Sequence, residues 1–253
     1  MESLYIGKFQ TKEAMEKFHN QLLKNSPIQP YDSIRWMLRQ EAMLQDAVLG
    51  KMPREYNIGK IDFRNIYNVI DFGGGSGWLF HLLSREIKNR LIRFNVIELE
   101  GTIKYFESKY KRGQVNYFLR SDFIAKNNSQ LGDETIFYSN SVIQYVLSDA
   151  MYIEIITAVE PKYLMFEDIY WTDTDNFFAL QKYYGDYLEL LFRNLDEFKT
   201  LICSLGYIVA QEFPYQQTIS SDFMSEVETI NGDIHQIKPR LTLVFEKCAS
   251  SFA

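Results

Sequence analysis

The chain has 253 residues, of which 46% are hydrophobic and 24% are charged, and its formal net charge at pH 7 is −6. This composition excludes disordered and collagen-like chains, and the acidic balance disfavours a nucleic-acid partner. No apolar run approaches the about 18 residues that span a bilayer, and the N-terminus lacks the pattern of a signal peptide. Cys203 and Cys248 lack metal-site spacing. We therefore predict a cytoplasmic globular protein with no bound metal and no membrane span.

The first 60 residues have helical spacing. Apolar residues from Thr11 to Leu23 predict one amphipathic helix, and a second helix is predicted to begin after Asp32 or Ser33 and to continue to Gly50. We therefore predict a helical N-terminal cap over residues 1–60 and one larger domain over residues 61–253.

From residue 65 short apolar runs alternate with longer amphipathic stretches, which predicts an α/β fold with a mainly parallel sheet. The final order of helix, strand, loop and strand fits a sheet that ends in an antiparallel hairpin. The seven predicted strands are 65–72, 93–100, 115–120, 135–140, 162–171, 208–215 and 241–247, and the predicted helices are 78–87, 102–112, 148–159 and 175–203.

A glycine-rich turn, Asp71-Phe72-Gly73-Gly74-Gly75-Ser76-Gly77, joins the first strand to the first helix. Glycines there permit positive φ and a close approach to a ligand, and the helix N-terminus offers free N–H groups. The spacing does not match G-x-G-x-x-G, and no Lys-Ser/Thr pair follows as in a phosphate loop. The remaining pattern, D-x-G-x-G-x-G, is typical of class I S-adenosylmethionine-dependent methyltransferases. A connector that serves only the fold is the alternative.

Polar residues follow the next three strands and predict the rest of a cofactor site. Glu98 lies about twenty residues past the last glycine, where a carboxylate can accept both hydroxyls of a ribose; Glu100 is the alternative. Asp122 and Phe123 follow the third strand, where they would bind the adenine amine and ring, although a helix-capping Asp is an equal alternative. The fourth strand is followed by a polar pair that would lie beside the sulfonium, Asn140 and Ser141.

Over nearly all residues from 65 to 247 the sequence resembles the class I methyltransferases. The segments VIDFGGGSG, NVIELE, SNSVIQYV and LFRNLDEFKTLICSLGYIVAQEF are most similar to methyltransferases encoded with bacterial surface-polysaccharide and O-antigen genes. The resemblance implies a Rossmann-like class I methyltransferase fold, S-adenosylmethionine as cofactor, and methylation, preferably on oxygen, of a small molecule or glycan precursor in surface-glycan biosynthesis. Glu167 to Trp171 replaces an Arg-Thr-Pro-like segment of these proteins, which points to a different substrate as an alternative.

Two residues are candidate bases for a hydroxyl or amine acceptor. His235 lies in a polar loop between the last two predicted strands, and Asp168, with Glu167 as its alternate, lies near the end of the fifth strand. A surface histidine without a role is an equal alternative for His235.

Candidate acceptor contacts follow the fourth strand and lie on the predicted helix 175–203. They are Gln144, Tyr145, Gln181 and Tyr184. Aromatic residues are abundant in the same segments, which predicts an aromatic-walled acceptor site with few charges. A non-catalytic binding subunit is the main alternative function. A nucleic-acid methyltransferase is disfavoured because the Asn/Asp-Pro-Pro-aromatic motif is missing. A homodimer is compatible with the sequence.

Overall fold

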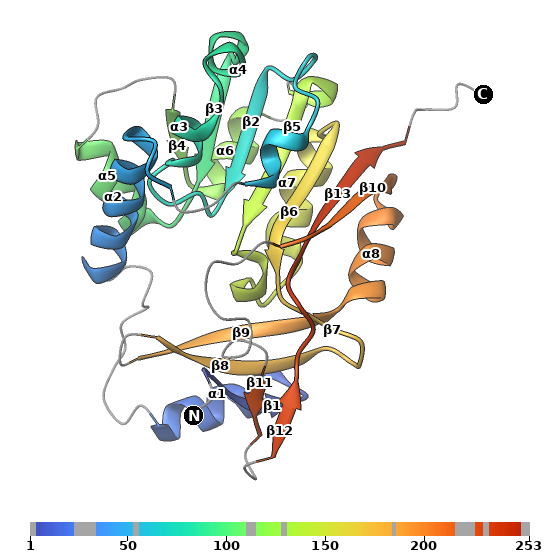
Figure 1. Cartoon of the computed structure of the whole chain (residues 1–253). Coiled ribbons are helices and arrows are strands. Elements are labelled where there is room, and N and C mark those ends of the chain that lie inside the picture. Colours follow the sequence, from blue (N-terminus) through green and yellow to red (C-terminus); the bar gives the residue numbers. More distant parts are fainter. Residues whose placement is uncertain are drawn as a thin grey trace.

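The protein folds into two β-sheets with helices around the larger one (Figure 1). The computed structural model describes residues 4–22, 34–52, 56–109, 115–127, 131–183, 186–215, 226–229 and 233–248. Among these residues, no helix is both long and apolar enough to cross a membrane.

The larger sheet has seven strands in the order β10-β13-β6-β5-β2-β3-β4. Its strands are β2 (Asn68–Phe72), β3 (Arg93–Ile97), β4 (Val115–Phe118), β5 (Thr135–Asn140), β6 (Tyr163–Ile169), β10 (Tyr207–Pro214) and β13 (Leu241–Lys247). β2 to β6 run parallel, whereas β13 is antiparallel to both β6 and β10. The predicted seven-stranded, mostly parallel sheet with a final antiparallel pair is thus confirmed.

The order of the strands creates a switch point at the carboxyl end of β2. From β2 the chain proceeds to β3 and β4 on one side, and it then returns to β5 and β6 on the other side. Ligands of open α/β sheets bind at such a point, because the loops after the two central strands diverge there. The glycine turn directly follows β2, so the fold places it at this position.

Both faces of the larger sheet are buried. Ile70 and Phe72 pack into one core cluster with Phe137 and Phe166, whereas Val69 packs into a second cluster on the opposite face. Helices cover the sheet: α3 (Leu79–Leu82), α4 (Arg85–Arg90), α5 (Glu100–Lys109), α6 (Arg120–Asn127), α7 (Ala150–Val159) and α8 (Leu195–Ser204). The predicted helix 78–87 is in fact two short helices, because Ser84 leaves the helical conformation and caps α4 by accepting the Ile87 N–H.

The smaller sheet has six strands in the order β12-β11-β1-β8-β9-β7. They are β1 (Tyr5–Phe9), β7 (Trp171–Thr172), β8 (Phe177–Tyr183), β9 (Asp186–Asn194), β11 (Glu226–Glu228) and β12 (Ile234–Gln236). In Figure 1 this sheet lies below the larger one, on the side to which the arrowheads of β2 and β5 point. The chain between β10 and β13 passes through β11 and β12, so the final antiparallel pair is not a tight hairpin.

The prediction of one helix over 175–203 is wrong for most of its length. Phe177–Tyr183 form β8 and Asp186–Asn194 form β9, and the helix α8 begins only at Leu195. The inward side chains Leu188, Leu190 and Phe192 alternate with less buried neighbours, which is a strand period. Leu, Glu, Gln and Lys are good helix formers and disguise this alternation, but pairing with β1 overrides their preference.

The N-terminal region is only partly helical. Helices α1 (Lys12–Leu22) and α2 (Ile34–Val48) lie within the two predicted helices, but β1 precedes them. β1 pairs with β8 and β11, which belong to the stretch 61–253. Met15 of α1 packs against Leu180 of β8, so residues from both the N-terminal region and the stretch 61–253 contribute to this part of the core. The proposed caps of α2, Asp32 and Ser33, lie outside the described residues.

Candidate functional site

The glycine turn after β2 has a conformation that requires glycine. Gly73, Gly75 and Gly77 have φ of 72°, 57° and 70°. A Cβ on Gly75 would lie 2.0 Å from Gln40 Oε1, and one on Gly73 would lie 2.5 Å from Val142 Cγ2. The turn is therefore packed on two sides as well as strained for any other residue.

Helix α2 covers the turn through Gln40, a residue that the sequence analysis missed. The Ser76 hydroxyl donates to the Gln40 carbonyl oxygen at 2.9 Å, and the Ser76 N–H donates to Gln40 Oε1 at 3.4 Å. Gln40 shares a buried helix face with Met37 and Leu44. A polar side chain on such an apolar face is the signal that could have identified it.

The ends of β3 and β4 also contact the turn. Glu98 Oε1 accepts the Gly75 N–H at 2.8 Å, and its Oε2 accepts the Leu99 N–H at 2.9 Å. From β4, the Tyr117 hydroxyl donates to the Ser76 carbonyl at 2.7 Å. Glu98 is half-buried, so part of its carboxylate surface remains accessible beside the turn. This arrangement fits a nucleoside ligand, because an accessible carboxylate next to an N–H-rich turn can accept ribose hydroxyls.

Asp71 lies under the turn. Its side chain is buried, and a Cβ on Gly74 would lie 2.3 Å from Asp71 Oδ2. Burial, and secondarily the charge of Glu98, raises the pKa of Asp71 well above its usual value. Oδ2 has no hydrogen-bonding partner among the described residues. Asp71 therefore supports the turn from inside the protein.

The pair predicted to bind adenine is divided between core and surface. Phe123 is fully buried and meets Phe118 edge-on, with ring centroids 5.6 Å apart, inside the core of the larger sheet. It offers no free ring face for an adenine. Asp122 is exposed in the first turn of α6, where a carboxylate favours the positive end of the helix.

Asn140 and Ser141 lie at the end of β5, next to Asp168 at the end of β6. The Asn140 amide donates to the Tyr138 hydroxyl at 3.1 Å, and the Ser141 hydroxyl donates to Asp168. Ser141 and Asp168 both have positive φ, 58° and 61°. Two strained non-glycine residues in contact are uncommon, and such strain is concentrated at functional sites.

Asp168 is an ion-pair partner in this structure. Its Oδ1 lies 2.6 Å from Nη1 of Arg240, which also donates to the Tyr170 hydroxyl at 3.2 Å. The Arg240 guanidinium lies between two aromatic rings, 5.1 Å from Tyr170 and 4.9 Å from Tyr215. A carboxylate held by a guanidinium is a weak base, so this geometry argues for a binding rather than a proton-accepting role.

Glu167, the alternate to Asp168, is buried and engaged in packing the fold. Its Oε1 accepts the Asn57 N–H at 2.9 Å, and its Oε2 accepts the Tyr138 hydroxyl at 2.8 Å. These bonds connect the segment after α2 to the larger sheet. Glu167 therefore has a structural role.

The structure separates His235 from the glycine turn. His235 lies on β12, the strand at the far edge of the smaller sheet, and Figure 1 shows that edge well away from the end of β2. The ring lies 3.5 Å from Lys8 Nζ and meets Phe177 edge-on, with centroids 5.3 Å apart. Burial and the charge of Lys8 lower the pKa of His235. Neither contact involves the switch point.

Tyr145 and Gln181, two predicted acceptor contacts, are brought together from the two sheets. The Tyr145 hydroxyl donates to Gln181 Oε1 at 2.6 Å. Tyr145 lies in the turn η4 (Ile143–Tyr145) after β5, whereas Gln181 lies on strand β8 and not on the helix that was predicted. Gln144, also in η4, is buried. Tyr184 lies outside the described residues.

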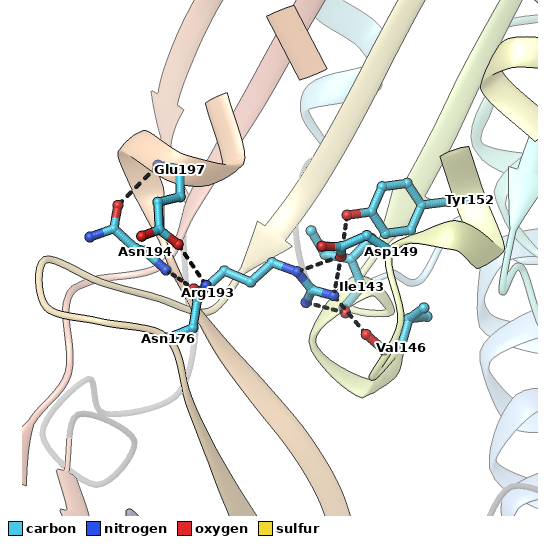
Figure 2. Close-up of polar contacts among 8 residues, drawn as sticks. All are labelled: Ile143, Val146, Asp149, Tyr152, Asn176, Arg193, Asn194 and Glu197. Carbon is cyan, nitrogen blue, oxygen red and sulfur yellow. Dashed lines mark hydrogen bonds and ion pairs between the residues drawn. The ribbon is translucent and has the colours of Figure 1, made fainter. Parts of the chain in front are cut away.

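Arg193 of β9 joins the smaller sheet to the same turn (Figure 2). Its guanidinium donates to the carbonyl oxygens of Ile143 and Val146, each at 2.6 Å. It also donates twice to Asp149 Oδ1, from Nε at 3.0 Å and from Nη2 at 2.7 Å. The sequence analysis missed Arg193, because a single arginine in a stretch taken for a helix carries no local signal.

Comparisons with known proteins identify the fold. No family model matches the sequence, and no curated protein matches it. Among solved structures, an S-adenosylmethionine-dependent methyltransferase from Leishmania major aligns over 98% of both chains, with 14% identity and a TM-score of 0.50. The mitomycin 7-O-methyltransferase MmcR aligns over 90% of this chain and 60% of its own, also with 14% identity and a TM-score of 0.50. The chain therefore shares the fold of these methyltransferases.

Proposed function

We propose that this protein is an S-adenosylmethionine-dependent methyltransferase. The observation that carries the proposal is the contact between Glu98 and Gly75, 2.8 Å from carboxylate to amide, at the switch point of the sheet. This contact places a ribose-binding type of carboxylate beside a glycine turn in which a Cβ would be crowded and the backbone strained. Glu98 and the turn from Gly73 to Gly77 would hold the cofactor, and Asn140 and Ser141 would lie beside its reactive end.

The bound cofactor would supply a methyl group that its positive sulfur already activates. The residues of the chain then have to align the acceptor, exclude water and receive the proton released from a hydroxyl or amine. The turn η4 and strand β8 supply Tyr145 and Gln181 for alignment. Asp168 is closer to this edge of the sheet than His235 is, but its ion pair with Arg240 favours a role in holding the acceptor.

We further propose a small molecule or glycan precursor as the acceptor, with transfer to oxygen. MmcR, a methyltransferase of similar fold, is an O-methyltransferase of mitomycin, which supports a small acceptor. The place in bacterial surface-glycan biosynthesis rests on the sequence resemblance alone. The second candidate function is a non-catalytic binding subunit, because a cofactor site can persist where transfer has been lost.

Calorimetry with S-adenosylmethionine tests the proposal. Wild-type protein should bind the cofactor, and Gly75→Val should not, because the new side chain would meet Gln40 and strain the backbone. Gly132→Ala is a matched control: Gly132 also has positive φ, 42°, but nothing lies within 4 Å of the position of its Cβ. It should bind like the wild type. Absence of binding by the wild type would overturn the proposal, and normal binding by Gly75→Val would overturn the site.

A further inference from the structure

Gln144 is a buried amide with no hydrogen-bonding partner among the described residues. The residue is 1% exposed, and neither Oε1 nor Nε2 is bonded within that part of the chain. Most buried side-chain polar atoms in proteins are hydrogen-bonded, and an unpartnered one lowers stability. Stability of the fold therefore does not explain why a carboxamide occupies this buried position.

The backbone around Gln144 is held rigidly. Arg193 donates to the carbonyl oxygens of Ile143 and Val146, the residues on either side of the Gln144–Tyr145 pair. Tyr145 is fixed in addition by Gln181 across the two sheets. The backbone on both sides of Gln144 is therefore held in place, as it is around a preorganised binding group.

Two ion pairs lie near this turn. Asp168 pairs with Arg240 at 2.6 Å, and Arg193 pairs with Asp149 at 2.7 Å. A charged acceptor would need an opposite charge and would have to break one of these pairs. An uncharged acceptor needs only hydrogen bonds. A carboxamide provides both a donor and an acceptor, which matches hydroxyl groups.

We infer that the Gln144 carboxamide binds hydroxyl groups of an uncharged methyl acceptor. This inference rests on the proposed methyltransferase function and makes Gln144 the group that selects the acceptor. The stability lost by leaving the amide unpartnered in the free protein is recovered when the acceptor's hydroxyls reach it. Stability and binding are therefore opposed at this residue, which is a trade-off seen at functional sites.

The test compares the thermal stability of two variants, Gln144→Met and Gln40→Met. Both replace a buried glutamine by an apolar side chain of similar length, but Gln40 is hydrogen-bonded to Ser76. We expect Gln144→Met to raise Tm by about 2–8 °C and Gln40→Met to lower it by about 2–4 °C. A fall in Tm for Gln144→Met would mean that its amide is satisfied within the fold, and it would overturn the inference.

Two further measurements separate this inference from the proposed function. Calorimetry should give Gln144→Met the same affinity for S-adenosylmethionine as the wild type within twofold, so a loss of that binding would reassign Gln144 to the cofactor. With S-adenosylhomocysteine present, glucose should raise the Tm of the wild type but not of Gln144→Met, and glucuronate should raise neither. No shift with glucose, or a larger one with glucuronate, would overturn the uncharged, hydroxyl-bearing acceptor.

Discussion

Replacing Arg193 by methionine should lower the free energy of unfolding of the whole protein, because this side chain connects the smaller sheet to the turn after β5. The guanidinium is buried and makes four hydrogen bonds, two to Asp149 and two to the carbonyls of Ile143 and Val146 (Figure 2). Methionine retains the unbranched stem and removes all four.

The expected loss follows from these partners. Breaking a buried ion pair costs about 3–5 kcal/mol. The Asp149 side chain is 36% exposed and can be solvated after the change, so the cost of breaking this pair should lie near the lower end of that range. The two carbonyls add about 1–3 kcal/mol each if they remain dry, but such losses are not additive. We expect a total of about 3–5 kcal/mol, or a fall in Tm of about 6–20 °C.

Urea unfolding of four proteins measures this loss: wild type, Arg193→Met, Asp149→Asn and the double variant. The coupling energy between the two residues should exceed about 1 kcal/mol, since the side chains are in direct contact. Arg193→Lys keeps the charge but not the planar fork, so it should recover less than half of the loss. A loss below about 1 kcal/mol for Arg193→Met, with an unchanged denaturant slope, would refute the view that this arginine joins the two sheets.

Three other predictions concern single carboxylates and a histidine. As pH rises from about 4, Asp71→Asn should gain stability relative to the wild type, by at most about 1.4 kcal/mol of unfolding free energy per pH unit. The reason is that the pKa of Asp71 is raised in the folded state, so the unfolded chain loses its proton first. Urea midpoints at successive pH values check this, and a constant difference between the two proteins would contradict it. Glu98→Gln should weaken S-adenosylmethionine binding about tenfold in calorimetry while the exposed Glu100→Gln binds normally, and equal affinities for the two would remove Glu98 from the site. His235→Gln should leave methyl transfer unchanged, and loss of transfer would restore His235 as a candidate base. As pH falls below about 6.5, the wild type should lose stability relative to the His235→Gln variant, because the pKa of His235 is lowered in the folded state and the unfolded chain takes up the proton first.

The larger sheet could be predicted because its signals are local. Strands such as β2 and β5 are short, rich in apolar residues and buried along nearly their whole length, which is typical of parallel strands covered on both faces. The glycine turn and Glu98 are likewise identified by their distance along the chain from one strand to the next. Their contact in the structure follows from the parallel register of β2 and β3, which pairs Phe72 with Ile97.

The smaller sheet could not be predicted because it is assembled from distant segments. β1 pairs with β8 and β11, which lie far away along the chain: Phe9 is paired with Phe178 and Tyr5 with Val227. β1 did carry a signal, since Tyr5, Gly7 and Phe9 alternate with less buried residues. Gln40, Arg193 and Arg240 were not predicted because each contacts a distant part of the chain: Gln40 the glycine turn, Arg193 the turn η4 and Arg240 the end of β6.

The aromatic residues after the fifth strand have a different use from the expected one. Tyr170 and Phe177 are among the aromatic residues of these segments, but both are buried against Phe192, with ring centroids 6.0 and 4.7 Å away, and Tyr5 meets Phe192 edge-on at 5.7 Å. Large rings therefore fill much of the core of the smaller sheet.

Polar groups lie at the edge of this aromatic core that is nearest to the turn after β5. Tyr145 packs against the core with its ring and reaches Gln181 with its hydroxyl, while Tyr170 stacks under Arg240 and shares its hydroxyl with that guanidinium. The rings thus fix the positions of hydroxyl, amide and guanidinium groups at the junction of the two sheets. In the proposed methyltransferase the aromatic core would therefore support the acceptor site from behind, and the polar residues at its edge would contact the acceptor.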